Sequence, residues 1–348
     1  MLVAEDSAVA RRLLVHILSS DPELRVIAEA RDGDEAVRVT ARQRPDIVVM
    51  DVVMPSMDGL EATRRIMELV PTPIVLVSAT HATGDQSRSF EALRAGALTL
   101  VAKPAGTQGR AFAAEAAALT TTVKLMAQVK LVRRRAAGGA TPPRTPAPSA
   151  SSPRARARVI EIVAIAASTG GPAALASILG TLPPTTPVPL LVVQHITPGF
   201  HQGLVEWLGR ASPVSVRLAA DMEPLRAGEV LIAPSDAHLG VTADGRVALS
   251  RDPPIRGHRP AATHLFGSVA GAYGSAAVGV ILTGMGDDGA AGLRTLKEAG
   301  GLVLAQDQAS SVVYGMPGTA ASLGIVDQVL PLDAMGGALI AAWNGARR

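Results

Sequence analysis

The chain has 348 residues, of which 48% are hydrophobic, 18% are charged and none is cysteine. This composition excludes a wholly disordered or fibrous protein, disulfides and thiolate metal sites, and the length exceeds what one hydrophobic core usually organises, so we expect two domains. Because no uncharged apolar run approaches the ~18 residues that span a bilayer and the start lacks the pattern of a secretion signal, a cytoplasmic protein without membrane insertion is predicted.

Before residue 133, apolar strand-like runs alternate with helical patterns, and the last helix is predicted from about residue 108 to residue 132. Five such β/α units over residues 1–132 indicate an α/β domain, a parallel sheet with helices on both faces. The strand-like runs are residues 2–5, 24–30, 47–51, 73–79 and 97–103.

Three carboxylates are expected to meet at one rim of this sheet. Glu5 and Asp6 follow the first strand, and Asp51 ends the third. Uncompensated, they would repel one another, and the physical remedy is a hard cation with oxygen ligands, for which Mg²⁺ is suited. Ser78 and Lys103 end the fourth and fifth strands, and a hydroxyl and an ammonium facing a carboxylate with its metal suit phosphoryl transfer to Asp51. Any one of these residues alone is more often an ordinary strand cap.

These residues together resemble the receiver domain of bacterial response regulators. The resemblance rests on Glu5-Asp6, the segment DVVMPSMDG (51–59), Ser-Ala at 78–79 and Lys-Pro at 103–104. It implies a flavodoxin-like (βα)5 fold in which Asp51 accepts phosphate from a partner histidine kinase of the chemotaxis type. It also implies that Glu5, Asp6 and Asp51 hold Mg²⁺, and that Ser78 and Lys103 sense the phosphoryl group. Leu100 departs from the family, which often has an aromatic switch residue there.

The net charge of +3 is concentrated between the two halves. Residues 106–158 carry ten Lys or Arg against a single acid, Glu115, so this stretch is +9 and the rest of the chain is net negative. Residues 138–158 are dense in Pro, Ser, Ala and Gly and cannot bury a core, so we expect a linker over residues 133–158. A basic connector between two acidic bodies is not a base-reading surface, and no nucleic-acid partner is expected.

The alternation resumes after the linker and indicates a second domain over residues 159–348, a doubly wound, mostly parallel α/β sheet. Asp244-Gly245 between two apolar runs predicts a β-hairpin. In sheets of this kind, sites form beyond the carboxyl ends of the strands. The strand-like runs are residues 159–167, 188–195, 214–220, 229–235, 278–284 and 301–307.

Three strand ends of this domain offer a hydroxyl, an imidazole and a carboxylate. Ser168 follows the first strand and precedes two glycines and a helix, where small neighbours let substrate approach and helix N-terminal amides can stabilise an oxyanion. A serine N-cap or a phosphate-binding turn is the alternative interpretation of this segment. His195 ends the next strand, and either Asp287 or Asp288 can supply the acid of an acyl-transfer relay, because spacing does not separate the two. The other histidines of this half are expected to be surface or structural residues: His201, His238, His258 and His264.

This half resembles the protein-glutamate methylesterases of bacterial chemotaxis. The resemblance implies Ser168 as nucleophile, His195 as general base and Asp288 as orienting acid, with Thr169 and Met285 shaping the oxyanion pocket. No cofactor is expected for this hydrolase chemistry. The segment RPAATHLF (259–266) departs from the family's usual RPSVDVLF. The matching stretches are AIAASTGGP (164–172), QHITPGF (194–200), IAPSDAHL (232–239), ILTGMGDDGAAGL (281–293) and SSVVYGMPG (310–318).

The two resemblances together predict a phosphorylation-activated hydrolase. It would demethylate glutamate γ-methyl esters on cytoplasmic helices of methyl-accepting receptors, release methanol, and deamidate receptor glutamines. The unphosphorylated receiver is expected to cover the active-site face. Two alternatives stay open at this point: a phosphorylation-controlled binding protein with an impaired hydrolase domain, and an esterase that acts on another protein substrate.

Overall fold

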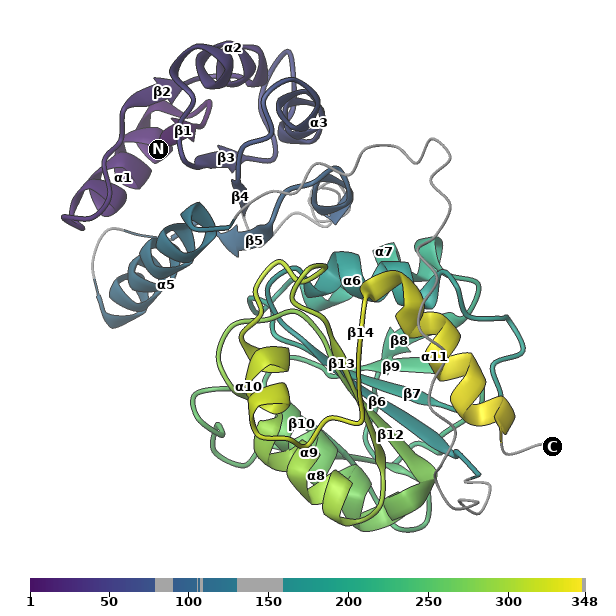
Figure 1. Cartoon of the computed structure of the whole chain (residues 1–348). Coiled ribbons are helices and arrows are strands. Elements are labelled where there is room, and N and C mark those ends of the chain that lie inside the picture. Colours follow the sequence, from purple (N-terminus) through teal and green to yellow (C-terminus); the bar gives the residue numbers. More distant parts are fainter. Residues whose placement is uncertain (79–89, 105, 107–108, 130–158, 346–348) are drawn as a thin grey trace, which may run out of the picture.

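The computed structural model describes residues 1–78, 90–104, 106, 109–129 and 159–345 (Figure 1). Over these residues the chain forms two α/β bodies, as the sequence predicts. The predicted linker, residues 133–158, lies outside the described residues, as do residues 130–132 of the predicted last helix. None of the described helices has the length and hydropathy needed to cross a membrane.

The first body contains one parallel sheet with the strand order β2-β1-β3-β4-β5. Its central strands are continuous apolar runs that are buried along their whole length, as expected when helices cover both faces of a sheet. The strands are β1 (Leu2–Ala4), β2 (Ala28–Ala30), β3 (Val48–Asp51), β4 (Ile74–Ser78) and β5 (Thr99–Ala102). The helices are α1 (Ala8–Ser19), α2 (Gly33–Gln43), α3 (Gly59–Leu69) and α5 (Arg110–Ala127), and residues 90–94 are also helical.

The second body contains a seven-stranded parallel sheet with the order β14-β13-β12-β6-β7-β9-β8. The predicted hairpin is present, but β10 and β11 form a separate two-stranded antiparallel sheet. The edge strand β14 was not predicted. The strands are β6 (Ile162–Ala167), β7 (Leu190–Gln194), β8 (Ser215–Leu218), β9 (Glu229–Ile232), β10 (His238–Val241), β11 (Val247–Ser250), β12 (Ala277–Ile281), β13 (Leu302–Gln306) and β14 (Gln328–Leu330).

Helices cover both faces of this sheet, and each face has its own core. Alternate residues of one strand supply the two cores: Ile165 packs on one face with Leu175 of α6, and Ala166 packs on the other with Phe266 of α8. The helices are α6 (Gly171–Leu179), α7 (His201–Ala211), α8 (Ala262–Tyr273), α9 (Ala290–Glu298), α10 (Met316–Ser322) and α11 (Leu332–Asn344), with a 3₁₀ turn η1 (Gly274–Ala276) before β12.

The carboxyl ends of three neighbouring strands position the second body's site. β12, β6 and β7 are adjacent, and their register pairs Ile281 with Ala166 and Ala167 with Gln194. Ser168 and His195 are the residues that directly follow β6 and β7. The chain therefore brings these two residues to the same edge of the sheet.

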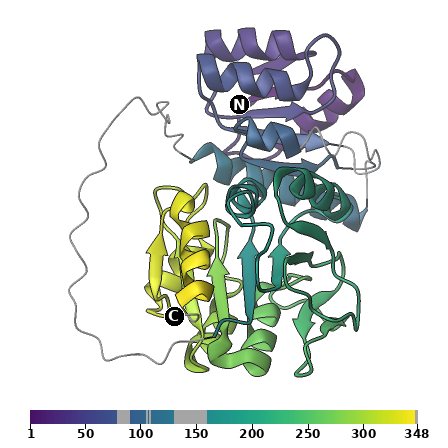
Figure 2. The same ribbon diagram turned by 90° about the vertical axis from the view of Figure 1, so that its right-hand side faces the viewer.

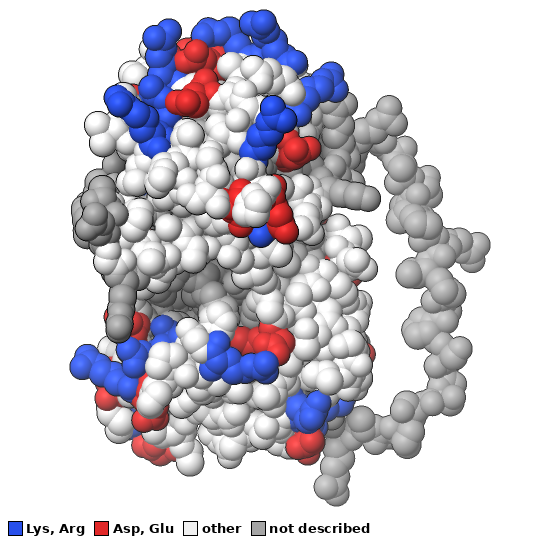
Figure 3. All heavy atoms as spheres, turned by 90° about the vertical axis from the view of Figure 1, so that its left-hand side faces the viewer, with Lys and Arg blue, Asp and Glu red and all other residues white. Residues whose placement is uncertain are grey.

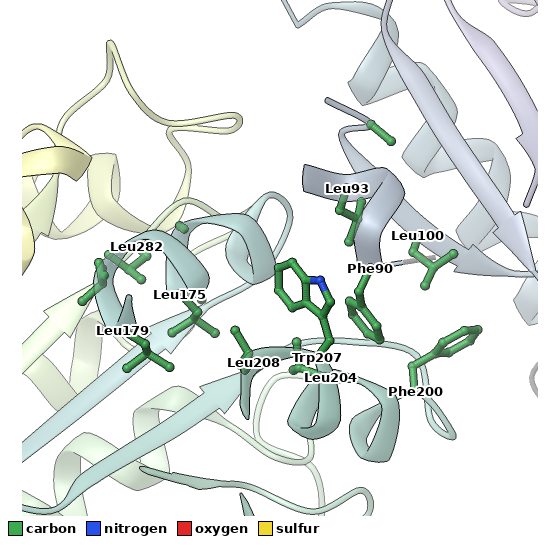
Figure 4. Close-up of a cluster of buried hydrophobic side chains, with 14 of the residues drawn as sticks. Phe90, Leu93, Leu100, Leu175, Leu179, Phe200, Leu204, Trp207, Leu208 and Leu282 are labelled. Carbon is green, nitrogen blue, oxygen red and sulfur yellow. The ribbon is translucent and has the colours of Figure 1, made fainter. Parts of the chain in front are cut away.

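The first body packs against this same edge of the second body (Figures 1 and 2). Phe90 and Trp207 of α7 stack with their ring centroids 5.6 Å apart, and both side chains are buried. Figure 4 shows Leu93 and Leu100 of the first body lying near the same α7 cluster, which includes Leu204. On the face drawn in Figure 3, charged side chains gather at the upper end and in patches at mid-height and in the lower half, and much of the remaining surface is uncharged. The contact between the bodies is therefore apolar.

Candidate active site

The turn after β6 presents Ser168 at the start of α6. Gly170 has a φ of 78°, a left-handed conformation that favours glycine, and a side chain there would meet Val312. The Gly171 N–H donates to the Ser168 carbonyl at 2.8 Å, and the Ser168 N–H donates to the Thr283 carbonyl at 3.0 Å. The turn is thereby tied both to itself and to the chain that follows β12.

Gln194, the last residue of β7, holds the Ser168 turn and His195 together. Its side-chain amide donates to the Ser168 carbonyl at 2.8 Å and to the His195 carbonyl at 2.9 Å. The His195 N–H donates to the Ala167 carbonyl at 2.9 Å. Sequence reasoning missed this role of Gln194, and the signal that could have found it is a buried polar residue directly before the histidine.

His195 makes its side-chain hydrogen bond to Asp288. The Nε2 atom lies 2.9 Å from Asp288 Oδ2, so Nε2 carries the proton that an ionised carboxylate accepts. The other nitrogen, Nδ1, is buried and has no hydrogen-bond partner. Ser168 and His195 line one cavity of about 160 Å³.

Asp288 is held ionised by its surroundings. It accepts backbone N–H groups from Ala262 at 2.7 Å and Thr263 at 3.0 Å, at the start of α8. Burial acts to raise the pKa of Asp288, but the hydrogen bonds and charge of His195 and the bonds from Thr263 outweigh it and hold the pKa well below its ordinary value. Ala262 and Thr263 belong to the divergent segment 259–266; their backbone N–H groups bond Asp288, and the Thr263 side chain bonds it as well.

Asp287, the neighbour that spacing could not separate from Asp288, faces elsewhere. Its carboxylate pairs with Arg256 at 2.8 Å and is 43% exposed, against 1% for Asp288. Sequence reasoning also missed His258, whose ring stacks on that of His195 with centroids 4.1 Å apart and an interplanar angle of 9°. His201 and His238 are buried structural residues, as expected.

The structure does not bring Thr169 and Met285 into the lining of this cavity. The Thr169 carbonyl accepts a hydrogen bond from Thr283 Oγ1 at 2.9 Å, and the Met285 side chain is 41% exposed. Helix α6 begins at Gly171, three residues after Ser168, so the positive end of its dipole lies next to the turn that carries the serine.

The first body supplies part of the cavity wall. The cavity is lined by Ser168 and His195 and also by residues of the first body that lie in and before β5. Leu100, which replaces the aromatic found in many receivers, is one of them and is only 7% exposed. In this arrangement the first body covers the mouth of the cavity that Ser168 and His195 line. The receiver residues in the wall are Leu93, Gly96, Ala97, Leu98, Thr99 and Leu100.

The carboxylate cluster of the first body surrounds Lys103. The ammonium lies 2.7 Å from Asp51 Oδ2 and 2.8 Å from Glu5 Oε2. Burial raises the pKa of Asp51, and burial together with the charge of Asp51 raises the pKa of Glu5, while Lys103 opposes both shifts. Ser78, which ends β4, is buried, and its carbonyl accepts the Lys103 N–H at 2.9 Å.

The donors of Glu5, Asp6 and Asp51 fit a hard divalent cation. One carboxylate oxygen from each lies within 4.8 Å of the others, and Asp6 is exposed, which leaves room for water ligands. An all-oxygen set with few carboxylates is the kind that Mg²⁺ takes in proteins.

Comparison with known proteins gives consistent matches to both halves. Residues 163–339 match the family model of the CheB methylesterase, and residues 1–110 match that of the response regulator receiver domain. The chain is 53% identical to protein-glutamate methylesterase/protein-glutamine glutaminase 4 of Myxococcus xanthus (strain DK1622), over 99% of this chain and 97% of that one. It is 50% identical to protein-glutamate methylesterase/protein-glutamine glutaminase 3 of Anaeromyxobacter dehalogenans (strain 2CP-C), over 96% of each.

Among solved structures, the catalytic domain of the Thermotoga maritima CheB methylesterase is similar to the second body. The similarity has a TM-score of 0.51 and 41% sequence identity, and it covers 52% of this chain and 97% of that domain.

Proposed function

We propose, from the premise that the chain belongs to the CheB methylesterase family with a receiver domain before the esterase domain, that Ser168, His195 and Asp288 are its catalytic triad. The enzyme is a phosphorylation-regulated protein-glutamate methylesterase and glutaminase of chemotaxis. Its parts are a receiver over residues 1–132, a linker over 133–158 and the esterase domain over 159–348.

One observation carries this proposal. His195 is fixed by a 2.9 Å hydrogen bond from Nε2 to Asp288, while its unpartnered Nδ1 lies in the cavity region that Ser168 also lines. A base oriented by a carboxylate and free on its other nitrogen beside a hydroxyl is the arrangement of a serine hydrolase.

The geometry gives each residue a step in ester hydrolysis. His195 Nδ1 accepts the proton as Ser168 Oγ attacks the ester carbonyl carbon, and the positive N-terminal end of α6 favours the oxyanion. The tetrahedral intermediate collapses with transfer of that proton to the methoxy oxygen, so methanol leaves and an acyl-enzyme forms. Water, deprotonated by His195, then attacks the acyl carbon, and the glutamate carboxylate is released with Ser168 restored. With a glutamine substrate, ammonia leaves instead of methanol.

The receiver controls access to this chemistry. Asp51 accepts the phosphoryl group from a chemotaxis-type histidine kinase, and Glu5, Asp6 and Asp51 would hold Mg²⁺, which supplies neutralisation of the phosphoryl charge. Lys103 must then exchange its contact with the Asp51 carboxylate for the phosphoryl oxygens. Because receiver residues form part of the cavity wall, activation requires a shift to a state in which the receptor helix replaces them.

Replacement of the nucleophile tests the function. Ser168→Ala in the full chain, activated with a small phosphodonor, should lower methanol release from membranes carrying methyl-labelled receptors by about 10³-fold or more. Ser177→Ala is the matched control, since Ser177 lies exposed on the same helix α6 and should release methanol at the wild-type rate. Persistent release by Ser168→Ala would refute the nucleophile, and release by neither wild type nor control would point to another substrate.

A further inference from the structure

The ring of His258 lies face to face with the ring of His195, and no function described so far uses it. The centroids are 4.1 Å apart and the planes differ by 9°. In the part of the chain that the structure describes, the His258 ring makes no hydrogen bond, so its position is set by the stack and by its own turn. From this geometry we infer that His258 is a positioning residue for the catalytic base, an inference that rests on the proposed function.

The turn that carries His258 is built to hold the ring in place. Ile255 and His258 exchange backbone hydrogen bonds of 3.0 Å in both directions, and Arg256 and Gly257 between them have φ angles of 52° and 87°. The Arg256 guanidinium then pairs with Asp287 at 2.8 Å. This ties the turn to the residue next to the catalytic acid, so the base and its stacking partner share one support.

The stack fixes the tilt of the His195 ring, which the hydrogen bond to Asp288 does not fix. A single bond from Nε2 leaves the His195 ring free to tilt about that contact, and tilting would move Nδ1 away from Ser168. A parallel ring against one face removes this freedom, in the way that ring pairs favour defined geometries. Misplacement of a catalytic group by about 1 Å can cost on the order of 10²-fold in rate.

The charge state of His258 is suited to the same role. The titratable and charged groups around it are His195, Asp288, Asp287 and, on its own turn, Arg256. Burial, and next the charge of His195, lower the pKa of His258, which keeps the ring neutral at neutral pH. A neutral ring tolerates the imidazolium that forms on His195 during the reaction, whereas a cation at the same place would repel it.

Three substitutions separate stacking from charge in the full chain with a phosphodonor. His258→Phe keeps a neutral ring, His258→Ala removes the ring, and His258→Arg offers a planar group with a permanent positive charge. We expect Phe to keep kcat within about threefold and Ala to lose roughly 10- to 100-fold in kcat with KM nearly unchanged. Arg should lose at least about tenfold more kcat than Phe, because the repulsion acts only on the charged transition state.

A spectroscopic readout reports on the base itself. In the wild type and in His258→Phe, the ¹⁵N chemical shifts of the His195 ring should show one tautomer with the proton on Nε2, and in His258→Ala they should show exchange averaging. His16→Ala is the matched control, because His16 is exposed on α1 of the receiver. Unchanged far-UV circular dichroism and thermal unfolding show that the variants fold.

The outcomes are distinct from those that test the proposed function. If Ser168→Ala abolishes methanol release but His258→Ala keeps the wild-type kcat and a single His195 tautomer, the inference about His258 is wrong and the esterase proposal stands. Equal kcat in His258→Phe and His258→Arg would overturn the charge argument. If Ser168→Ala remains active, the proposed function fails first.

Discussion

The imidazole of His195 uses its two nitrogens for different partners, and this division determines how the site works. Nε2 faces Asp288, and Nδ1 is buried without a hydrogen-bond partner among the described residues, which is the nitrogen that the proposed mechanism gives to Ser168. Asp288 is buried and takes part in three hydrogen bonds, whereas its neighbour Asp287 is half-exposed and pairs with Arg256. A single residue position thus separates the carboxylate that bonds His195 from one that pairs with the Arg256 loop.

The first prediction at this scale concerns the two aspartates. Asp288→Asn should lower kcat by about 10⁴-fold, because an amide does not favour the Nε2–H tautomer or stabilise the imidazolium. Asp287→Asn should cost less than about tenfold, since it weakens only the tether to Arg256. Methanol release by the phosphodonor-activated full chain measures both, and equal losses would mean that the acid has been misassigned.

The second prediction at this scale concerns the pH dependence of stability that the buried His201 causes. Burial lowers the pKa of His201 to about 4, although the charge of Asp236 opposes the shift. Below pH ~6.5 the His201 side chain takes up a proton in the unfolded chain but stays neutral in the folded domain. Protonation therefore favours the unfolded chain, so the folded domain has its full stability above pH ~6.5 and loses part of it as the pH falls toward 4. We expect the free energy of unfolding to drop by up to about 3 kcal/mol over this window.

Trp207 and Trp343, the two tryptophans of the chain, both lie in the esterase domain, so their fluorescence follows its unfolding. His201→Gln should reduce this pH dependence, because glutamine does not titrate. A variant with the full wild-type slope would assign the slope to other groups.

At the scale of elements, the helix α6 and the strand β7 are joined through a close approach that only glycine permits. Gly171 opens α6, and a Cβ there would collide with the Gln194 side chain and approach the Ala167 Cβ to 2.7 Å. The Gln194 amide in turn bonds the nucleophile turn and the base. The geometry of the triad therefore depends on how closely one helix start packs on one strand end.

Gly171→Ala tests this dependence. The added methyl should push Gln194 out of place, destabilise the esterase domain by about 1–3 kcal/mol and lower kcat. Gly267→Ala is the matched control, since Gly267 lies inside α8 with no atom within 4 Å of the new methyl. It should leave kcat unchanged and stabilise the domain by about 0.5–1 kcal/mol. Denaturant unfolding followed by tryptophan fluorescence measures the free energy of unfolding of both variants. If that free energy changed in the same direction in both, the close approach of Gly171 would not be the cause.

At the scale of the whole molecule, the receiver and the esterase domain share an apolar contact at the mouth of the site. Phe90 stacks on Trp207 at 5.6 Å, and neighbouring receiver residues line the cavity that holds Ser168 (Figure 4). Contacts that exist only in the covered state bias the molecule toward it, and in the proposed function phosphorylation at Asp51 overcomes that bias.

Phe90→Ala should therefore raise the basal activity. Loss of the buried ring removes stabilisation from the covered state alone, and methanol release without phosphodonor should rise about tenfold. Asp51→Asn is the complementary variant: it should keep the low basal rate and lose the response to phosphodonor. An unchanged basal rate in Phe90→Ala would show that the stack does not restrain the enzyme.

The sequence by itself determined the class of the fold and the kind of chemistry. Apolar runs alternating with helical patterns report a parallel α/β sheet locally, and polar residues directly after such runs must gather at its carboxyl edge. The two-body α/β architecture and the hydrolase family are thereby confirmed. Strand limits were less well predicted: β2 covers three of the seven residues expected, and the edge strand β14 was missed because its exposed residues carry no apolar run.

Only the tertiary structure decided which side chains meet. Gln194 bonds the carbonyls of Ser168 and His195, and His258 stacks on His195 from a loop 63 positions away. Spacing left Asp287 and Asp288 open and the family resemblance pointed to Asp288, whose contact with His195 the structure shows. Phe90 and Trp207 come together from different domains. Such contacts arise from the packing of segments distant in the chain, and residue type and local spacing carry no information about the direction in which a loop side chain turns.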